Sequence, residues 1–200
     1  MLYVNALFFI ISTFLLEDVD VASKYTCRTA QIHIETSSRF MDVVADNYQV
    51  YSEVNPSTGE VFFQGLMKSF EFELGALDRA FNNSTVDLSQ YSKFSYEGSI
   101  TNLSGIKFDQ PGTYNVNVDG KIFIGSYIRK TSARGSLKVL ANGRLETVAD
   151  FSIRIEEESM NTINDLMRKR LPKVVSLDTD KLGISRDIKI NLKANYRPRN

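Results

Sequence analysis

The sequence predicts an all-β protein that folds as an eight-stranded antiparallel barrel with one or two short helices. Eight short segments alternate apolar and polar residues, and turn-forming residues separate several of them. An open sheet of such strands would leave two unpaired edges, whereas closure into a barrel removes them. The eight segments are residues 30–35, 49–54, 61–68, 94–100, 113–124, 133–139, 144–155 and 188–196.

The first four segments each place apolar or small residues on one face. Between the second and third segments, residues 55–60 read NPSTGE, which predicts a hairpin turn because proline and glycine favour turn conformations. The alternation assigns the following residues to the inner face: Ala30, Ile32, Ile34, Val50, Ser52, Val54, Val61, Phe63, Gly65, Met67, Phe94, Tyr96, Gly98 and Ile100.

The fifth segment reads TYNVNVDGKIFI. Its even-numbered positions are apolar or glycine, and its odd-numbered positions from Asn115 to Lys121 are polar. Further on, Asn142 and Gly143 predict a type I′ hairpin turn, which needs a positive φ at both residues. The inner face of the last four segments comprises Tyr114, Val116, Val118, Gly120, Ile122, Ile124, Ala133, Gly135, Leu137, Val139, Leu145, Thr147, Ala149, Phe151, Ile153, Ile155, Ile188, Ile190, Leu192, Ala194 and Tyr196.

Two segments have helical rather than strand periodicity. Apolar residues recur every three or four positions within residues 73–83, which is the spacing of one helix face. The same spacing runs through residues 160–167, and this helix has to end before Pro172. No internal repeat or low-complexity linker suggests a second domain.

The N-terminal segment predicts export. Residues 2–16 form an almost unbroken apolar run, shorter than the ~20 residues of a membrane span and typical of a signal-peptide core. The small residues in Val21-Ala22-Ser23 then suit a cleavage site. We expect a signal peptide over residues 1–23, a barrel domain over residues 24–200, a periplasmic location, and no stable membrane span in the mature protein. An uncleaved N-terminal anchor is the alternative.

Charge and cysteine content narrow the function classes. The 24 basic residues balance the 24 acidic ones, so the protein as a whole has no field that would attract nucleic acid. Cys27 is the only cysteine, which excludes an intrachain disulfide and a CxxC metal or redox pair. His33, the only histidine, falls on the polar phase of its strand and is expected at the surface.

The sequence contains no recognisable catalytic arrangement. The motifs GxSxG, HExxH, GxGxxG and the Walker loop are all missing. Residues 156–158 are three glutamates, expected to be a solvated charge run rather than a cation site. Residues 168–170 are basic, and we expect the wet face of a short helix there, with contact to a lipid headgroup or phosphate as the alternative. We expect a protein that is not an enzyme and uses no metal or cofactor.

Small residues among the bulky ones on the inner face allow two interpretations. They could leave volume for a tunnel that holds an apolar chain. Alternatively, small and large residues alternate to fill a tapering barrel, or the glycines mark bulges and bends. The small inner residues are Ala30, Gly65, Gly98, Gly120, Ala133, Gly135, Ala149 and Ala194.

An ordered set of segments resembles the YceI-like family, in the form common among Bacteroidetes. The set comprises LMKSFEFELGALDRAFNN, YSKFSYEGSITNLSGIKF and GTYNVNVDGKIFI, and the likeness runs from about residue 30 to residue 196. This resemblance implies an eight-stranded antiparallel, lipocalin-like barrel that is usually exported to the periplasm. It also implies a lumen that holds a long amphiphile, with polyprenyl chains as the known ligand type, and no shared catalytic residue.

The sequence departs from that family in three places. Gly125 stands where the family has a histidine, and Ser92 stands where it has a proline. The segment 159–182 is also longer than usual. The first departure removes any role of the histidine, so the ligand's identity is not carried over. The third makes the longer segment a candidate lid or partner surface.

From the alternation and the resemblance, we expect non-covalent binding or carriage of a long-chain amphiphilic lipid of the isoprenoid type. The alternative is a structural or interaction protein with a filled barrel that acts through its surface helix. Nucleic acid is not an expected partner, and the oligomeric state is left open. The candidate lumen lining comprises Phe63, Met67, Leu77, Phe81, Phe94, Tyr96, Tyr114, Val116, Val118, Ile122, Ile124, Leu137, Phe151, Ile153, Ile190 and Leu192, with Leu77 and Phe81 closing one end.

Overall fold

The structure is a computed structural model, and it describes residues 24–37, 42–75, 78–79, 92–157 and 185–199. Two short 3-10 turns, η1 (Met67–Ser69) and η3 (Leu103–Gly105), lie between strands. The strands are β1 (Lys24–Ser37), β2 (Asp42–Val54), β3 (Glu60–Leu66), β4 (Glu71–Phe72), β5 (Lys93–Ile100), β6 (Gly112–Ile124), β7 (Tyr127–Val139), β8 (Leu145–Arg154) and β9 (Asp187–Arg199).

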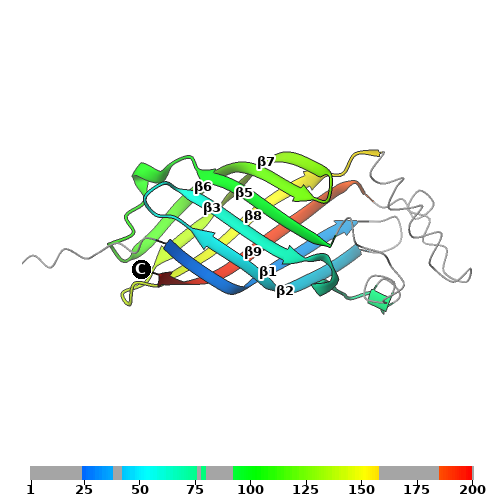
Figure 1. Cartoon of the computed structure of the whole chain (residues 1–200), viewed down its shortest axis with the longest axis horizontal. Helices are drawn as coiled ribbons and strands as arrows, with labels where there is room; N and C mark the ends of the chain where they lie inside the picture. The colour runs from blue at the N-terminus through cyan, green and yellow to red at the C-terminus, as the bar shows by residue number, and fades with distance from the viewer. Residues whose placement is uncertain (1–23, 38–41, 76–77, 80–91, 158–184, 200) are drawn as a thin grey trace, which may run out of the picture.

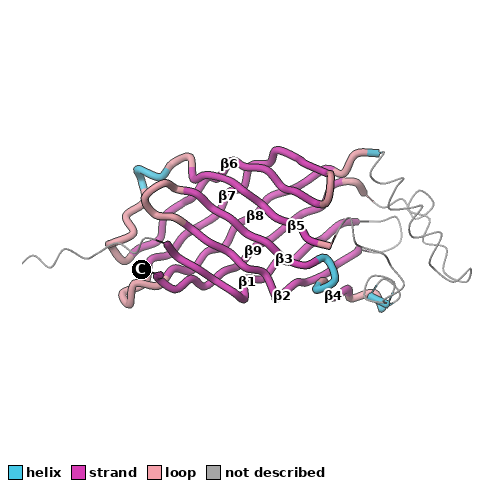
Figure 2. Tube along the Cα trace, in the orientation of Figure 1, coloured by secondary structure: helices cyan, strands magenta, loops and turns pink. Residues whose placement is uncertain are grey.

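Eight long strands close a barrel, as the sequence predicts (Figure 1, Figure 2). Around the ring their order is β1-β9-β8-β7-β6-β5-β3-β2, every neighbouring pair is antiparallel, and β1 also pairs with β2 to complete the closure. The two-residue strand β4 lies outside this ring and pairs with β2. No helix in the described part of the chain is long and apolar enough to cross a membrane.

All eight predicted strands are confirmed, but three begin several residues earlier than predicted. β1 begins at Lys24 rather than at residue 30, β2 at Asp42 rather than at residue 49, and β7 at Tyr127 rather than at residue 133. Tyr25 and Cys27 are buried on one phase of β1, whereas Ala30 and Ile32 are buried on the other. The pairing of β1 with β2 shifts register on both sides of Ala30. A bulge at such a shift reverses the alternation, which is why a search for one unbroken period finds only the second half of the strand.

Strand β2 has a matching irregularity at Asn47. This side chain is completely buried (0% exposed), although the next two residues are both exposed. Its Nδ2 donates to the carbonyl oxygen of Leu66 at 3.0 Å, and its Oδ1 accepts from the backbone N–H of Gln49 at 2.9 Å. The amide thus satisfies two backbone groups near the point where the pairing with β1 shifts.

The turn after β7 differs from the sequence prediction. Only Gly143 has a positive φ, +74°, and Asn142 does not, so the type I′ prediction is wrong. The N–H of Gly143 donates to the carbonyl of Leu140, and Leu140 and Arg144 frame a three-residue loop. Such a loop needs only one residue in the left-handed region, and glycine supplies it. The NPSTGE hairpin between β2 and β3 is confirmed.

The core extends into the connection between β5 and β6. Ile106 and Phe108 from this connection are both 8% exposed and belong to the apolar core. The ring of Phe108 stacks on that of Tyr25, with centroids 6.0 Å apart. These side chains fill the barrel at the end where β1 begins and β9 finishes. The helix predicted over residues 160–171, and most of the one over residues 73–83, lie outside the described residues.

Candidate functional site: the barrel lumen

The predicted lining residues that the structure describes are buried in the barrel core or pack against it. Two of the predicted lining residues, Leu77 and Phe81, lie outside the described residues. Four are partly buried and pack against the core: Met67, Tyr114, Val118 and Ile124. The rest are buried: Phe63, Phe94, Tyr96, Val116, Ile122, Leu137, Phe151, Ile153, Ile190 and Leu192.

Aromatic rings occupy the middle of the lumen. Phe63 on β3 and Tyr96 on β5 stack in parallel, with centroids 5.0 Å apart and planes 6° apart. Phe151 comes from β8, on the far side of the ring of strands, and meets these two rings at 6.4 and 6.1 Å. Toward one end, Phe94 extends the cluster, and its ring centroid lies 5.4 Å from that of Phe70. The opposing walls are therefore in contact through aromatic side chains.

The aromatic rings pack against the inner glycines. Gly98 and Gly120 face each other across β5 and β6, and the ring of Tyr96 lies against both. A Cβ at Gly120 would come within 2.6 Å of the Tyr96 Cζ and 2.4 Å of the carbonyl oxygen of Glu97. In the same way, a Cβ at Gly65 would lie 2.5 Å from the Cζ of Phe94. The space left by these glycines is taken up by neighbouring aromatic rings rather than by an open tunnel.

A small cavity remains between the aromatic cluster and the walls of β6–β9. Its volume is about 80 Å³, roughly half that of a ~150 Å³ engineered apolar cavity that binds benzene. A long lipid chain can enter only if side chains move. The side chains that border the cavity are mostly apolar, and they include Val54, Phe63, Tyr96, Ile100, Val116, Val118, Ala133, Leu137, Ala149, Phe151 and Leu192.

Three hydroxyl groups lie on one side of this cavity, from Ser52, Thr147 and Tyr196. The Ser52 and Tyr196 hydroxyls are 2.7 Å apart, and Ser52 also donates to the carbonyl of Phe62 at 3.0 Å. Burial raises the pKa of Tyr196 to about 12, and its hydrogen bond with Ser52 offsets part of that rise. The alternation places these three residues on the inner face, but the sequence prediction does not include them in the lining. The signal in the sequence is a residue with a hydroxyl group at a position whose neighbours on the same face of the strand are apolar.

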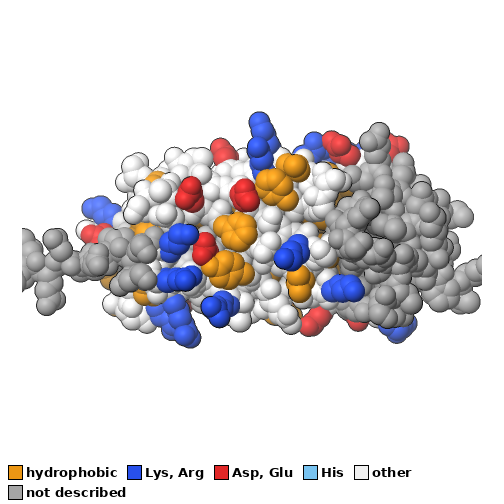
Figure 3. All heavy atoms as spheres, in the orientation of Figure 1, with side chains coloured by type: hydrophobic (Ala, Val, Ile, Leu, Met, Phe, Trp, Pro, Cys, Tyr) orange, Lys and Arg blue, Asp and Glu red, His pale blue; other side chains and the backbone are white. Residues whose placement is uncertain are grey.

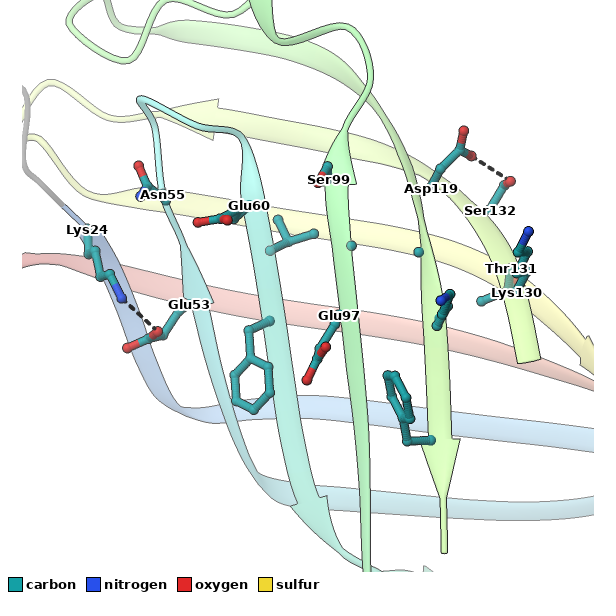
Figure 4. A pocket seen from close by; sticks show the side chains of 16 residues that line it. Lys24, Glu53, Asn55, Glu60, Glu97, Ser99, Asp119, Lys130, Thr131 and Ser132 are labelled. Atoms are coloured by element: carbon teal, nitrogen blue, oxygen red, sulfur yellow. Dashed lines mark hydrogen bonds and ion pairs between the residues drawn. The ribbon is translucent and has the colours of Figure 1, made fainter. Parts of the chain in front are cut away.

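The outer wall carries a second, larger hollow across β2, β3, β5, β6 and β7, with a volume of about 970 Å³ (Figure 4). Its labelled side chains are all polar, and dashed lines mark the ion pair of Lys24 with Glu53 at 3.4 Å and the hydrogen bond from Ser132 to Asp119 at 2.6 Å. The Tyr51 hydroxyl donates to Glu53 and, with Lys24, lowers the pKa of that carboxyl.

The face of the barrel drawn in Figure 3 mixes hydrophobic side chains with both acidic and basic ones. Along one row across the sheet, Phe62 pairs with Glu97 and Glu97 with Lys121. The same row continues from Phe62 to Glu53 on one side and from Lys121 to Lys130 on the other. Acidic and basic residues both line the hollow, which therefore offers no field of one sign to a charged ligand. The lumen is therefore the better candidate site.

Of the charged residues singled out in the sequence, Glu156, Glu157 and His33 have partners on the surface, whereas Glu158, the basic residues 168–170 and the segment 159–182 lie outside the described residues. Glu156 forms an ion pair with Arg129, and Glu157 lies 3.5 Å from Arg186. His33 is partly exposed and lies 2.9 Å from Asp46 on β2. Within the described ranges, no group of three or more His, Cys, Asp and Glu side chains could hold a metal ion.

The barrel is shared with solved structures that resemble it only weakly in sequence. A polyisoprenoid-binding domain from Saccharophagus degradans, implicated in plant cell wall breakdown, matches with a TM-score of 0.66 at 10% identity, over 89% of this chain and 99% of that one. A mutant CJ YCEI protein made for nanotechnology applications matches with a TM-score of 0.42 at 13% identity, over 82% of this chain and 85% of its own. No protein-family model matches the chain, and no curated protein matches its sequence. The first likeness shows that the fold is a lipocalin-like, eight-stranded antiparallel barrel.

Proposed function

We propose that this protein binds or carries a long-chain lipid, of the isoprenoid type, in the lumen of its barrel, without catalysing a reaction. The observation that carries the proposal is the apolar cavity in the middle of a closed barrel, walled by Phe63, Tyr96 and Phe151. Support comes from the shared fold of a domain that is described as polyisoprenoid-binding. We further propose that the chain belongs to the YceI-like family, an assignment that rests on the ordered sequence segments and this fold.

The energetics are compatible with a lipid that displaces side chains. Burying a methylene group is worth ~0.8 kcal/mol, so a chain of about ten buried carbons gains roughly 8 kcal/mol before ordering costs. Moving a side chain out of its preferred rotamer costs about 0.5–1.5 kcal/mol. Turning two or three rings, such as Phe63 and Phe151, therefore costs less than this gross gain. The cavity marks the place where the walls are already apart.

The proposed location is the periplasm. Its support is the apolar segment at residues 2–16 followed by small residues, because this order of features is typical of a secretory signal peptide. Residues 1–23 lie outside the described residues. The mature protein would then begin close to Lys24, the first residue of β1.

Filling the cavity tests the site. Ala133 on β7 is 6% exposed and borders the cavity. In Ala133→Leu, the larger side chain should take up this space and weaken binding of geranylgeraniol at least tenfold, about 1.4 kcal/mol. Isothermal titration calorimetry measures the affinity. Ala133→Val adds a smaller side chain, so its affinity should fall between those of the unmodified protein and Ala133→Leu.

Lys138→Leu is the matched control, because it introduces the same side chain on β7 at an exposed position that does not border the cavity. This variant should bind as the unmodified protein does. A folded Ala133→Leu protein with unchanged affinity would exclude the lumen as the binding site. If neither the unmodified protein nor any variant binds the probe, a filled barrel that acts through its surface becomes the better interpretation. The aromatic rings that occupy the space beside the inner glycines are compatible with such a filled barrel.

A further inference from the structure

The one buried tyrosine of the aromatic cluster has a hydroxyl group with no partner. Tyr96 is 2% exposed, and its hydroxyl makes no hydrogen bond. Leaving such a group unpaired costs free energy in a folded protein, and buried tyrosine hydroxyls usually have a partner. Tyr196, in the wall of the same cavity, follows that rule through its contact with Ser52.

The backbone fixes where the Tyr96 hydroxyl lies. The ring rests on Gly98 and Gly120, and the hydroxyl oxygen is only 2.9 Å from the position that a Cβ of Gly98 would occupy. Any side chain on these glycines would collide with the ring or with backbone oxygens. The pair of glycines therefore holds a polar group inside an apolar lumen, beside the cavity that Tyr96 lines.

The surrounding charges restrict what could bind this hydroxyl. Burial and the negative charge of Asp119 raise the pKa of Tyr96 to about 12, so the group stays protonated and can donate. Among the residues that line the cavity, Arg134 is the one with a charged side chain, and it lies at an exposed position. An anionic group at this depth would be near Asp119 and would lack a buried cation to compensate its charge.

On the basis of the proposed lipid binding, we propose that the lumen ligand carries a neutral oxygen atom, in a carbonyl, ether or hydroxyl group, that accepts a hydrogen bond from Tyr96. The cavity would then select oxygenated isoprenoid chains over hydrocarbons of the same skeleton. It would also disfavour phosphorylated chains whose head would have to reach Tyr96. The ligand supplies the partner that the protein lacks.

Tyr96→Phe tests this, because it removes the hydroxyl and keeps the ring. The unmodified protein should bind geranylgeraniol more tightly than the hydrocarbon of the same skeleton that lacks the hydroxyl, by roughly three- to tenfold. In Tyr96→Phe this preference should disappear through weaker binding of the alcohol alone. The melting temperature of the ligand-free variant should stay the same or rise, since an unpaired polar group has been removed.

Tyr127→Phe is the matched control. It also removes one tyrosine hydroxyl, but from a group that does not border the cavity and already donates to the carbonyl oxygen of Arg154 at 2.9 Å, so it should leave the preference for the alcohol intact. Equal preference for the alcohol in Tyr96→Phe and in the unmodified protein would overturn the assignment. So would a lowered melting temperature of ligand-free Tyr96→Phe, because it would mean that the hydroxyl is paired within the protein, for example with a buried water. If the unmodified protein binds neither probe, the proposed lipid function itself fails.

Discussion

At the scale of single residues, the buried tyrosines set how the protein responds to alkaline solution. The pKa values of Tyr96 and Tyr196 are raised from 10.0 to about 12, in both cases mainly by burial. Between these values, an unfolded chain has lost the two phenolic protons while the folded barrel still holds them. The folded state then binds more protons, so stability falls as the pH rises from about 10 to about 12.

We therefore expect the free energy of unfolding to be steady between neutral pH and about pH 10 and to drop above it. Tyr196→Phe should lose about 1 kcal/mol at neutral pH, because its hydrogen bond to Ser52 disappears. Above pH 10 the same variant should lose stability less steeply than the unmodified protein, as should Tyr96→Phe. Urea unfolding across this pH range measures both effects. Identical slopes in all three proteins would show that these phenols do not control the alkaline transition.

At the scale of the elements, the irregularity of β2 depends on one side chain. Asn47 is fully buried and binds the carbonyl of Leu66 and the N–H of Gln49. Asn47→Ala would leave these backbone groups unpaired, at a cost of about 1–3 kcal/mol for each group that stays buried. We expect a clearly lowered midpoint in chemical denaturation. Gln49→Ala, two residues further along β2 at an exposed position, should change stability by less than ~0.5 kcal/mol. If the two variants proved equally stable, Asn47 would have no role in holding the bulge.

The sequence predicts the elements that follow a single period and misses those that change it. β6 is predicted almost to its ends because its alternation is unbroken from Thr113 to Ile124. The early part of β1 is missed because a bulge near Ala30 reverses the phase, and a bulge depends on the partner strand rather than on local residue type. For the same reason Asn47 is not recognisable in the sequence as a core residue.

The candidate site shows a similar division. Alternation identifies which side chains face inward, and the described residues of the predicted lining are buried or pack against the core. It does not give the volume between them, because that depends on how Tyr96 and Phe94 lie over the glycines of neighbouring strands. Whether the small inner residues leave a tunnel or are covered by neighbouring side chains depends on three-dimensional packing, which the sequence pattern does not give.

At the scale of the whole molecule, closure makes the lumen a single compartment. β1 pairs with both β9 and β2, so the ring of strands is closed. Phe108 and Tyr25 fill one end of the core. A ligand in the middle must therefore occupy space between the aromatic cluster and the walls, and its presence should be detectable as an added mass on the intact barrel.

Native mass spectrometry of the protein purified from a bacterial periplasm, followed by solvent extraction and identification of the bound lipid, tests this central claim most directly. We expect a stoichiometric adduct that extracts as a long-chain lipid of the isoprenoid type and carries a neutral oxygen. A bare protein mass, unchanged after incubation with geranylgeraniol, would contradict the claim and would mean that the lumen is filled only by its own side chains.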